Sequence, residues 1–444
     1  MNDTICAIAT PYGVGSISII RLSGDESVEI VNKIFKGANL TKKNTHTVSY
    51  GHIYDEDVLL DEVLVSIFLA PRSFTKENVV EIGCHGGVYV TNRILETLCK
   101  NGARLANPGE FTKRAFLNGR IDLTQAEAIM DLISAENETA LNMANDALNK
   151  STKKLIDDLK EVLIEQIGKI EVNIDYPEYD DVEIMTNEIV KPKLLDMSSM
   201  MDKILEKSKI SQVFSTGIKT CIVGRPNVGK SSLLNLLLNE EKAIVSNIAG
   251  TTRDIVEGKL NIGGVTLNLL DTAGIRNTDD YVEAIGVEKA KELIKTSELV
   301  ILVLDGSEKL NKVDLELLSL TENKMRIIII NKEDKGLQFD IKDAIKMSTL
   351  SAKGLDILED EIIKLTKKEA LTDKRYLTNK RHITLLNNAK KSLDEAIKSI
   401  EISMPIDVVE IDLKACWNYL LEITGEVSSE KILDELFSRF CLGK

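Results

Sequence analysis

The residues best suited to grip a phosphate chain are the eight from Gly224 to Ser231, which spell Gly-Arg-Pro-Asn-Val-Gly-Lys-Ser. A β-branched apolar segment, Thr220 to Val223, precedes them, and helix-forming residues follow, so the G-x-x-x-x-G-K-[ST] pattern has its required strand, loop and helix setting. Glycines let backbone N–H groups approach the phosphates, and the helix N-terminus adds partial positive charge. We expect Lys230 to reach the β and γ phosphates and Ser231 to ligate Mg²⁺.

Two further motifs follow apolar strands in the order expected of a guanine-nucleotide site. Leu267 to Leu270 leads into Asp271-Thr272-Ala273-Gly274, in which the aspartate can hold a magnesium water and the glycine N–H can contact the γ phosphate. Ile327 to Ile330 leads into Asn331-Lys332-Glu333-Asp334. An aspartate accepts from guanine N1–H and N2–H₂, a donor pair that adenine lacks. Each motif is weak alone, and the three in order predict a site that prefers GTP to ATP.

The loop that backs the base has two possible alignments. Ser351-Ala352-Lys353 has the more usual composition, whereas the spacing to Gly354-Leu355 favours Ser348-Thr349-Leu350, which we adopt. The nucleotide-binding set expected so far is Asn227, Val228, Gly229, Lys230, Ser231, Ser232, Asp271, Thr272, Ala273, Gly274, Asn331, Lys332, Asp334, Ser348, Thr349 and Leu350.

Composition limits the class of protein that carries this site. With 444 residues, 43% hydrophobic and 28% charged, the chain is long enough for several globular domains. Its longest apolar runs fall far short of the roughly 20 residues that span a bilayer, and no secretion signal begins it, so we expect a cytoplasmic location. Six dispersed cysteines and 4 histidines support neither a zinc site nor a disulfide framework. A net charge of -14 disfavours indiscriminate nucleic-acid binding and leaves a selective RNA contact open.

The elements around the site change character along the chain. Short β-branched stretches between Gly and Pro predict an α+β domain over 1–118, and apolar residues at spacings of three and four predict helices over 119–215. The acidic cluster around Pro177 interrupts them and is best interpreted as a solvated loop. Strands alternating with helices predict a parallel sheet over 216–370, and helical spacing returns over 371–444. We therefore expect the α/β domain to be inserted into a helical domain.

Four segments carry a resemblance to known families. They are Ala9-Thr10-Pro11 with Arg21-Leu22-Ser23-Gly24, the stretch from Asn107-Pro108-Gly109-Glu110-Phe111-Thr112 to Arg120, Gly250-Thr251-Thr252-Arg253-Asp254, and the terminal Phe440-Cys441-Leu442-Gly443-Lys444. The Gly250 to Asp254 segment, with Asn227, resembles bacterial translation-factor-related GTPases in general, and the other three narrow the resemblance to the MnmE (TrmE) family of tRNA-modification GTPases over essentially the whole chain. The resemblance implies a multidomain α/β fold: an N-terminal α+β folate-binding domain, a central helical domain, and an inserted Ras-like P-loop GTPase domain with a parallel-rich sheet and flanking helices.

The same resemblance implies partners and a reaction. The N-terminal domain would form a homodimer and bind a 5-formyl- or 5,10-methylene-tetrahydrofolate through Arg21, Glu81, Arg120 and Lys444. The FAD-dependent protein MnmG would join it in a heterotetramer-type complex. Together they would install an aminomethyl or carboxymethylaminomethyl group on carbon 5 of the tRNA wobble uridine, using the folate's one-carbon unit.

The motifs do not include a residue that positions the attacking water, and the resemblance suggests which groups take part in hydrolysis. A Ras-like enzyme carries glutamine directly after Asp-Thr-Ala-Gly, but Ile275 stands here. The family implies K⁺ in place of an arginine finger, when two G domains meet, and Glu283 to polarise the water, although a solvated acid at a helix start fits Glu283 equally well. The metal ligands implied are Asn227, Ser246, Ile248 and Thr251 for K⁺ and Ser231 and Thr252 for Mg²⁺, within a nucleotide loop of Ser246, Asn247, Ile248, Ala249, Gly250, Thr251 and Thr252.

Cys441 and the competing functions complete the sequence-based expectations. The family places Cys441 near the folate and makes it important for tRNA modification, whereas a lone cysteine is more often a buried free thiol. One competing function is a ribosome-assembly GTPase switch, and another is a GTPase that remodels membranes. The first would need an RNA-binding module such as one with a GxxG loop, and we find none downstream of the GTPase domain. The second would need a basic amphipathic helix or a transmembrane segment, and the sequence indicates neither.

Overall fold

The computed structural model describes residues 3–175, 187–239, 256–270, 283–365, 375–440 and 443. The chain divides into two compact units, one of Met1–Met130 with Leu420–Lys444 and one of Asp131–Tyr419. The multidomain α/β class expected from the sequence is confirmed by the two sheets and the helices around them. The boundaries near 118, 215 and 370 remain predictions, because the two units are divided at other positions. Within the ranges given above, no helix has both the length and the apolar character needed to cross a membrane.

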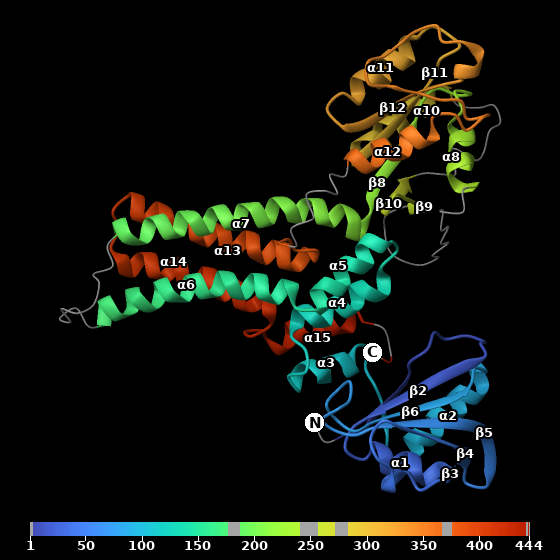
Figure 1. Ribbon diagram of the computed structural model, residues 1–444, viewed down its shortest axis with the longest axis vertical. Helices are drawn as coiled ribbons and strands as arrows, with labels where there is room; N and C mark the ends of the chain where they lie inside the picture. The colour runs from blue at the N-terminus through green and yellow to red at the C-terminus, as the bar shows by residue number, and fades with distance from the viewer. Residues whose placement is uncertain are drawn as a thin grey trace. The chain divides into compact units, whose positions relative to one another are not determined.

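The first unit is built on a mixed sheet whose described strands run in the order β3-β4-β5-β6-β2-β1-β7. The strands are β1 (Ile5–Ile8), β2 (Ile17–Ser23), β3 (Phe35–Gly37), β4 (Thr47–Asp55), β5 (Val58–Phe68), β6 (Val79–His85) and β7 (Arg104–Leu105). All neighbours are antiparallel except β1 and β7. Helices α1 (Ser27–Ile34) and α2 (Val88–Lys100) bury their apolar stripes against one face, which forms the main core of this unit (Figure 1).

The other face of β1 and β2 faces a smaller apolar cluster. Ile5 and Ala7 pack there with Phe111, which belongs to α3 (Glu110–Leu117). Next to it, the start of α4 (Leu123–Ser134) packs with α15 (Glu430–Ser438), so segments about 300 residues apart in the sequence share one core. This arrangement brings the N-terminal motifs close to the C-terminal one.

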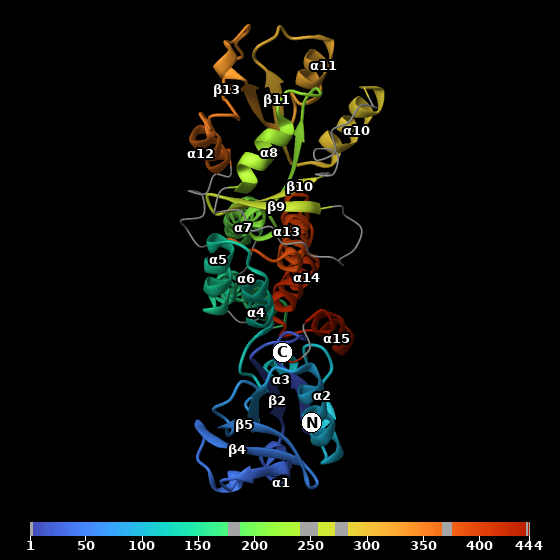
Figure 2. The same cartoon turned by 90° about the vertical axis from the view of Figure 1, so that its right-hand side faces the viewer.

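The helices of the second unit come from both sides of the second sheet in sequence. They are α5 (Glu138–Leu148), α6 (Ser151–Asp175), α7 (Asn187–Thr216), α13 (Lys380–Glu401) and most of α14 (Ile406–Thr424). Helices α7 and α13 lie side by side (Figures 1 and 2), and Lys390 of α13 bridges to Asp202 of α7 at 3.3 Å. Because residues 217–374 lie between these helices in sequence, their packing supports the expectation that the α/β part is inserted.

The second sheet has its described strands in the order β13-β12-β11-β8-β10-β9. The strands are β8 (Ile218–Val223), β9 (Val256–Ile262), β10 (Val265–Leu270), β11 (Leu299–Asp305), β12 (Met325–Asn331) and β13 (Ile345–Lys346). All neighbours are parallel except β9 and β10. Helices α8 (Lys230–Asn239) and α12 (Leu355–Leu365) cover one face, and α10 (Glu283–Thr296) and α11 (Lys312–Leu320) cover the other.

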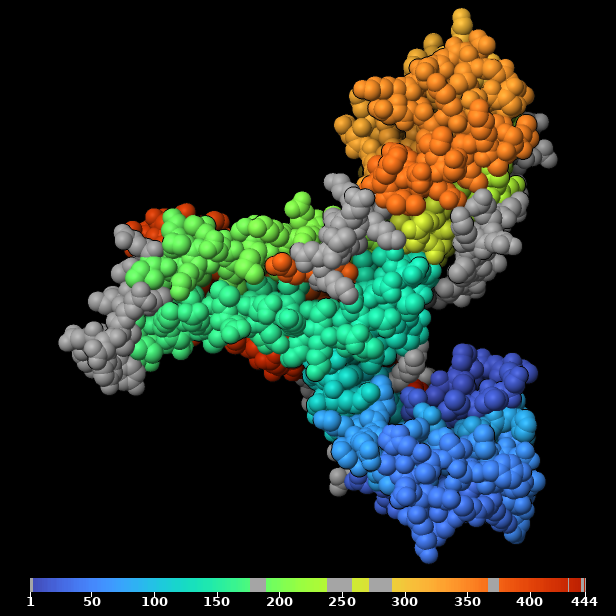
Figure 3. All heavy atoms as spheres, viewed as in Figure 1, coloured from blue at the N-terminus to red at the C-terminus, as the bar shows by residue number. Residues whose placement is uncertain are grey.

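This topology positions the site. Strand β11 is buried along its whole length, as expected of a parallel strand covered on both faces. The side chains of β11 pack with those of the covering helices in the cores on the two faces of the sheet, and the surface atoms of 290–365 form the yellow to orange region of Figure 3. The carboxyl ends of β8, β11 and β12 share one edge of the sheet, which is where ligands bind in such folds.

Candidate functional site

The phosphate loop leaves β8 in a conformation that its two glycines make possible. Gly224 has φ 157° and Gly229 has φ 103°, both in the region that side chains disfavour. A Cβ on Gly224 would lie 2.3 Å from the Val303 carbonyl oxygen, and one on Gly229 would lie 2.1 Å from Asn331 Nδ2. The glycines therefore let the loop pass close to β11 and to Asn331. Helix α8 begins at Lys230, so its free N–H groups lie beside the loop.

Lys230 is a cation held among neutral groups. Its Nζ donates to the carbonyl oxygens of Gly224 at 2.9 Å and Arg225 at 2.6 Å. Burial lowers its pKa to about 8, because a low-dielectric surrounding disfavours the ammonium form. A phosphate bound in the loop would supply the missing negative charge. Lys230 thus fits the phosphate-binding role expected from the sequence.

Arg225 fixes the first half of the loop to a neighbouring helix. Its Nε donates to Asp314 Oδ1 at 2.9 Å, and its Nη2 lies 3.4 Å from Glu308. Asp314 is buried and also forms a capping box with Asn311 at the start of α11. The phosphate loop is consequently anchored through a buried carboxylate that the sequence motifs do not include.

The base-recognition residues meet at the ends of β12 and β13. Asn331 donates from Nδ2 to the Val228 carbonyl oxygen at 2.8 Å and accepts from the Thr349 N–H at 3.1 Å. The Ser348 hydroxyl donates to Asp334 Oδ1 at 2.6 Å. The side chain of Asn331 therefore joins the phosphate loop to the base-backing loop, and Ser348 orients the carboxylate of Asp334.

Lys332 and the competing segment have other contacts. Lys332 has φ 64° and pairs with Asp305 at the end of β11 at 2.6 Å. In the alternative base-backing segment, Lys353 pairs with Glu333 at 3.0 Å. In the adopted segment, Leu350 is exposed. Of the two alignments, Ser348-Thr349-Leu350 is the one whose side chains form hydrogen bonds with Asn331, at 3.3 Å, and with Asp334, at 2.6 Å.

Several expected site residues lie outside the described residues. They are the loop of Ser246, Asn247, Ile248, Ala249, Gly250, Thr251 and Thr252, the segment Asp271, Thr272, Ala273 and Gly274, and the terminal Cys441 and Lys444. Glu283 is the first residue of α10, as expected for an acid at a helix start, and its side chain also lies outside them. Their roles remain predictions.

A second cluster forms on the first unit around the residues expected to bind folate. Arg21 and Glu81 are cross-strand neighbours on β2 and β6, and they form an ion pair at 2.8 Å. The Arg21 guanidinium lies 5.8 Å from the ring centres of both Phe74 and Phe111. Arg120 also lies over the Phe74 ring, with Cζ 4.8 Å from its centroid. The structure thus gathers three of the four expected residues around an aromatic ring.

Burial and the C-terminal segment shape this cluster further. Burial lowers the pKa of Arg120, because partial desolvation disfavours the charged guanidinium and no carboxylate offsets this effect. Arg21 Nη1 also donates to the Gly443 carbonyl oxygen at 3.3 Å. The sequence-based set did not include Phe74, Phe111 or Gly443. Phe111 lies within the Asn107 to Thr112 motif, but no local pattern marks Phe74, and only the fold brings the two rings to Arg21.

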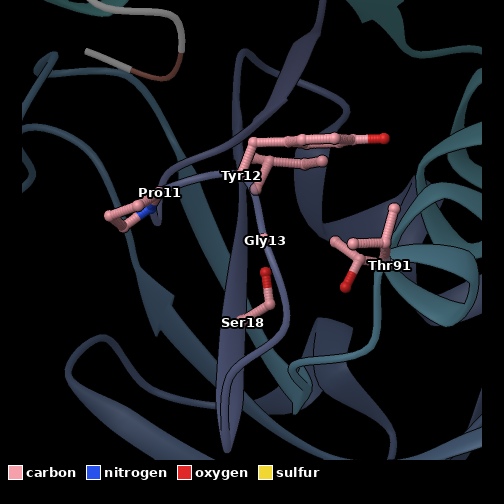
Figure 4. A pocket seen from close by; sticks show the side chains of 7 residues that line it. Pro11, Tyr12, Gly13, Ser18 and Thr91 are labelled. Atoms are coloured by element: carbon pink, nitrogen blue, oxygen red, sulfur yellow. The ribbon is translucent and has the colours of Figure 1, made fainter. Parts of the chain in front are cut away.

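A small pocket lies on the opposite side of β2. Its lining residues are Ile8, Pro11, Tyr12, Gly13, Ser18, Val88 and Thr91. Figure 4 shows Tyr12 and Gly13 on the loop after β1, with Ser18 on β2 and Thr91 on α2 around them. Side chains alternate along a strand, so Ser18 and Arg21 face opposite sides of the sheet. The pocket is therefore separate from the Arg21 cluster.

The second unit defines the class of protein. A phosphate loop after the first strand of a parallel-rich sheet, with an Asn-Lys-Glu-Asp segment after a later strand at the same edge, is the nucleotide site of a P-loop GTPase.

The comparisons with known proteins give the family. Residues 4–120 match the model of the GTP-binding protein TrmE N-terminus, and residues 123–441 match that of the MnmE helical domain. The tRNA modification GTPase MnmE of Acholeplasma laidlawii is 55% identical over 100% of this chain and 99% of its own length. That of Lactococcus lactis subsp. cremoris is 49% identical over 100% of this chain and 98% of its own length. The chain belongs to the MnmE family of tRNA modification GTPases.

Among solved structures, the G domain of the FeoB iron transporter of T. maritima matches with 26% identity and a TM-score of 0.25. The match covers 34% of this chain and 99% of that chain.

Proposed function

We propose that this GTPase takes part in tRNA modification at carbon 5 of the wobble uridine, with a folate-derived one-carbon unit and a flavoprotein partner. The observation that supports the proposal is that each sheet carries a cluster of side chains suited to one of the two ligands, GTP or the folate. One is the nucleotide edge of the second sheet, and the other is the Arg21, Glu81 and Arg120 cluster of the first. Membership of the MnmE family supports the choice of tRNA as substrate.

At the nucleotide edge, each residue has a defined task. Lys230 leaves the carbonyl oxygens that now hold it and pairs with the β and γ phosphates, while the N–H groups at the start of α8 donate to them. Asp334, oriented by Ser348, accepts from guanine N1–H and N2–H₂. Asn331 holds the two loops together, so the base and the phosphates bind at a fixed separation.

The two described residues of the expected metal sets, Ser231 and Asn227, suit the ions that such hydrolysis uses. Ser231 is half-buried in the first turn of α8, so its hydroxyl oxygen is a suitable ligand for a hard divalent cation beside the phosphates. Asn227 is exposed with φ 60° at the tip of the loop, where a second G domain could approach. Mg²⁺ and K⁺ would neutralise charge that develops between the β and γ phosphates. We assign Ser231 and Thr252 to Mg²⁺, and Asn227, Ser246, Ile248 and Thr251 to K⁺.

Turnover of GTP tests the nucleotide site. The wild type should hydrolyse GTP and not ATP, faster in KCl than in NaCl at equal ionic strength. Lys230→Ala should lose about 100-fold or more in turnover, because the phosphates lose their main charge partner. Lys291→Ala, which removes a half-exposed surface lysine paired with Glu316 at 2.8 Å, is the matched control and should leave turnover intact. Equal turnover of GTP and ATP would overturn the assignment.

The second cluster has the chemistry to recognise a reduced folate. A glutamate carboxylate accepts from an amino-pyrimidine edge, guanidinium groups pair with a glutamyl carboxylate, and an aromatic ring offers a stacking surface. Titration with 5-formyl-tetrahydrofolate should show binding that Arg21→Ala and Glu81→Gln each weaken by about tenfold or more. Arg93→Ala, whose guanidinium pairs with Asp55 at 2.7 Å elsewhere in this unit, should bind normally. A ribosome-assembly switch would show no folate binding.

The modification itself is tested in cells. A deletion strain should lack the substituted wobble nucleoside in tRNA digests analysed by mass spectrometry, and the wild-type gene should restore it. Cys441→Ser should hydrolyse GTP normally yet fail to restore the substituted wobble nucleoside. Glu283→Ala should bind GTP but lose most of its hydrolysis activity.

We expect a cytoplasmic homodimer that forms a complex with a FAD-dependent protein, which co-purification from the same strain would detect. Unaltered wobble nucleosides in the deletion strain would exclude the proposal.

A further inference from the structure

The hairpin of β9 and β10 occupies a special place in the nucleotide-binding part. The segment expected to contact the phosphates, Ser246 to Thr252, precedes β9, which begins at Val256. The other expected catalytic segment starts at Asp271, directly after β10 ends at Leu270. Any displacement of this hairpin therefore displaces the chain ends from which both segments start. The hairpin also lies at the edge of the sheet, where β9 pairs with β10 alone among the described strands.

We propose that Asn137, in the helical part of the chain, is a positioning residue for GTP hydrolysis that locks this hairpin to helix α5. The proposal rests on the nucleotide site assigned above and adds a residue that none of its motifs contains. The same contacts would transmit a displacement of the hairpin to helices α5 and α7.

The side chain of Asn137 is fully engaged on three sides. It is only 7% exposed. Its Nδ2 donates to Thr266 Oγ1 on β10 at 3.0 Å and to the Phe214 carbonyl oxygen in the last turn of α7 at 3.1 Å. Its Oδ1 accepts from the Ala140 N–H at 2.7 Å, which caps the start of α5. One buried amide therefore connects the hairpin to two helices.

The residue before Asn137 holds the other strand of the hairpin. The carboxylate of Glu136 pairs with Lys259 on β9. The Glu136 carbonyl oxygen accepts from Asn261 Nδ2, also on β9, at 3.3 Å. Two consecutive residues between α4 and α5 thus bind both strands of the hairpin.

Apolar packing makes this attachment a rigid one. Met143 on α5 and Phe214 on α7 are buried in the same core as Val265 and Leu267 of β10. Asn268 of β10 donates to the Thr216 carbonyl oxygen at the end of α7 at 2.8 Å. Interiors packed in this way do not deform continuously, so the hairpin and the helix ends move together.

Loss of the hydrogen bonds from Asn137 to Thr266 and Phe214 should lower the rate of GTP hydrolysis more than the affinity for nucleotide. The residues that bind the base and phosphates stand on β8, β12 and their loops, which Asn137 does not contact. The expected catalytic segments start from the hairpin, and displacement of reacting groups by about 1 Å can cost up to about 100-fold in rate. The expected signature is therefore a lower kcat with unchanged nucleotide affinity.

Asn137→Asp keeps the cap at the start of α5 and removes the two hydrogen bonds that Asn137 Nδ2 donates. Its carboxylate still accepts from the Ala140 N–H and suits a helix N-terminus, but it cannot donate to Thr266 or Phe214. We expect kcat for GTP to fall by about tenfold, with KM for GTP and Kd for GDP within about twofold of the wild type. Thr266→Val removes the acceptor at nearly constant shape and should lower kcat by about threefold. In the double variant the losses should not add, because both remove one interaction.

Asn379→Asp is the matched control. Asn379 caps α13 by accepting from the Arg381 N–H at 2.8 Å, away from the hairpin, so hydrolysis should be unchanged. An unchanged kcat in both Asn137→Asp and Thr266→Val would overturn the proposal. So would a rise in the Kd for GDP that matches the loss of kcat, since that would indicate general loosening of the domain. A wild type without GTPase activity would instead refute the nucleotide site.

Discussion

At the scale of single residues, Lys230 combines a charge with burial. Its lowered pKa, about 8 against the usual 10.5, means that the nucleotide-free fold disfavours the charged form. The unfolded chain binds more protons than the folded one between these two values, so this lysine makes the free energy of unfolding rise with pH across that window. Below pH 8 the destabilisation caused by burying the charged Lys230 side chain is fully present. A bound phosphate should remove it.

The first prediction concerns the proton that accompanies nucleotide binding. At pH 8.5 most of the free protein carries neutral Lys230, and a bound triphosphate restores the ammonium, so binding should take up roughly three-quarters of a proton. At pH 7 the uptake should be close to zero. Calorimetric titration with GTP in buffers of different ionisation enthalpy measures it. Equal uptake at both pH values would contradict the lowered pKa.

The second prediction concerns base choice. Asp334→Asn replaces an acceptor pair with a group that can donate, so affinity for GTP should fall by about 100-fold or more. Xanthosine triphosphate, which has a carbonyl where guanine has the exocyclic amine, should bind better than GTP to this variant. Competition between fluorescent nucleotides measures the preference. Asp340→Asn, whose exposed carboxylate pairs with Lys346 at 3.1 Å, should keep the wild-type preference.

At the scale of elements, the phosphate loop depends on a helix that contributes nothing to its sequence motif. Asp314 in the first turn of α11 accepts both from Arg225 and from the Asn311 N–H. The loop and the helix follow different strands, β8 and β11, which are neighbours in the sheet. Pairing of these strands is what brings the arginine to the carboxylate.

The third prediction follows from that contact. Asp314→Ala removes a carboxylate whose side chain is 2% exposed, and with it the acceptor of Arg225 Nε and of the Asn311 N–H. The free energy of unfolding should fall by about 2 to 3 kcal/mol in urea denaturation. Glu308→Ala removes the other carboxylate near the same guanidinium, which is 64% exposed, and should cost less than about 1 kcal/mol. Similar losses in the two variants would show that burial does not decide the strength of this contact.

At the scale of the whole molecule, the two ends of the chain meet in one unit. Gly443 has φ 85°, and a Cβ there would lie 2.3 Å from the Ile8 carbonyl oxygen and 2.9 Å from Ala9 Cα. The absence of a side chain therefore lets Gly443 lie against the end of β1, and its carbonyl oxygen accepts from Arg21. This contact ties the terminal motif to the expected folate cluster.

The fourth prediction uses this close approach. Gly443→Ala should displace the terminal segment and weaken binding of 5-formyl-tetrahydrofolate by about tenfold, while GTP turnover stays within about twofold. Gly102→Ala is the control, because Gly102 also has positive φ (114°) but its nearest contact is Ile30 Cδ1 at 3.8 Å. It should lose a little stability and keep folate affinity. Equal folate binding by both variants would exclude a role for the terminal segment.

Local patterns predicted much of the fold and of the nucleotide site. The β-branched run at 299–304 lies in β11, the run at 327–330 lies in β12, and helical spacing after residue 122 marks real helices. The phosphate loop and the Asn-Lys-Glu-Asp segment were recognisable because each is a short stretch whose local geometry follows from its own residues. The contacts Arg21–Phe74, Arg225–Asp314 and Asn137–Thr266 were not, because each joins segments that lie far apart in the sequence and no local pattern marks the pair.

The sequence alone therefore determined which nucleotide the protein is built for, since glycine spacing and one carboxylate act within a few residues of chain. Only the tertiary structure decided what anchors those segments: Asp314 for the loop, Ser348 for Asp334, and Asn137 for the hairpin. The physical reason is that a contact between distant segments depends on strand order and helix packing, which are properties of the assembled sheet rather than of any one stretch of residues.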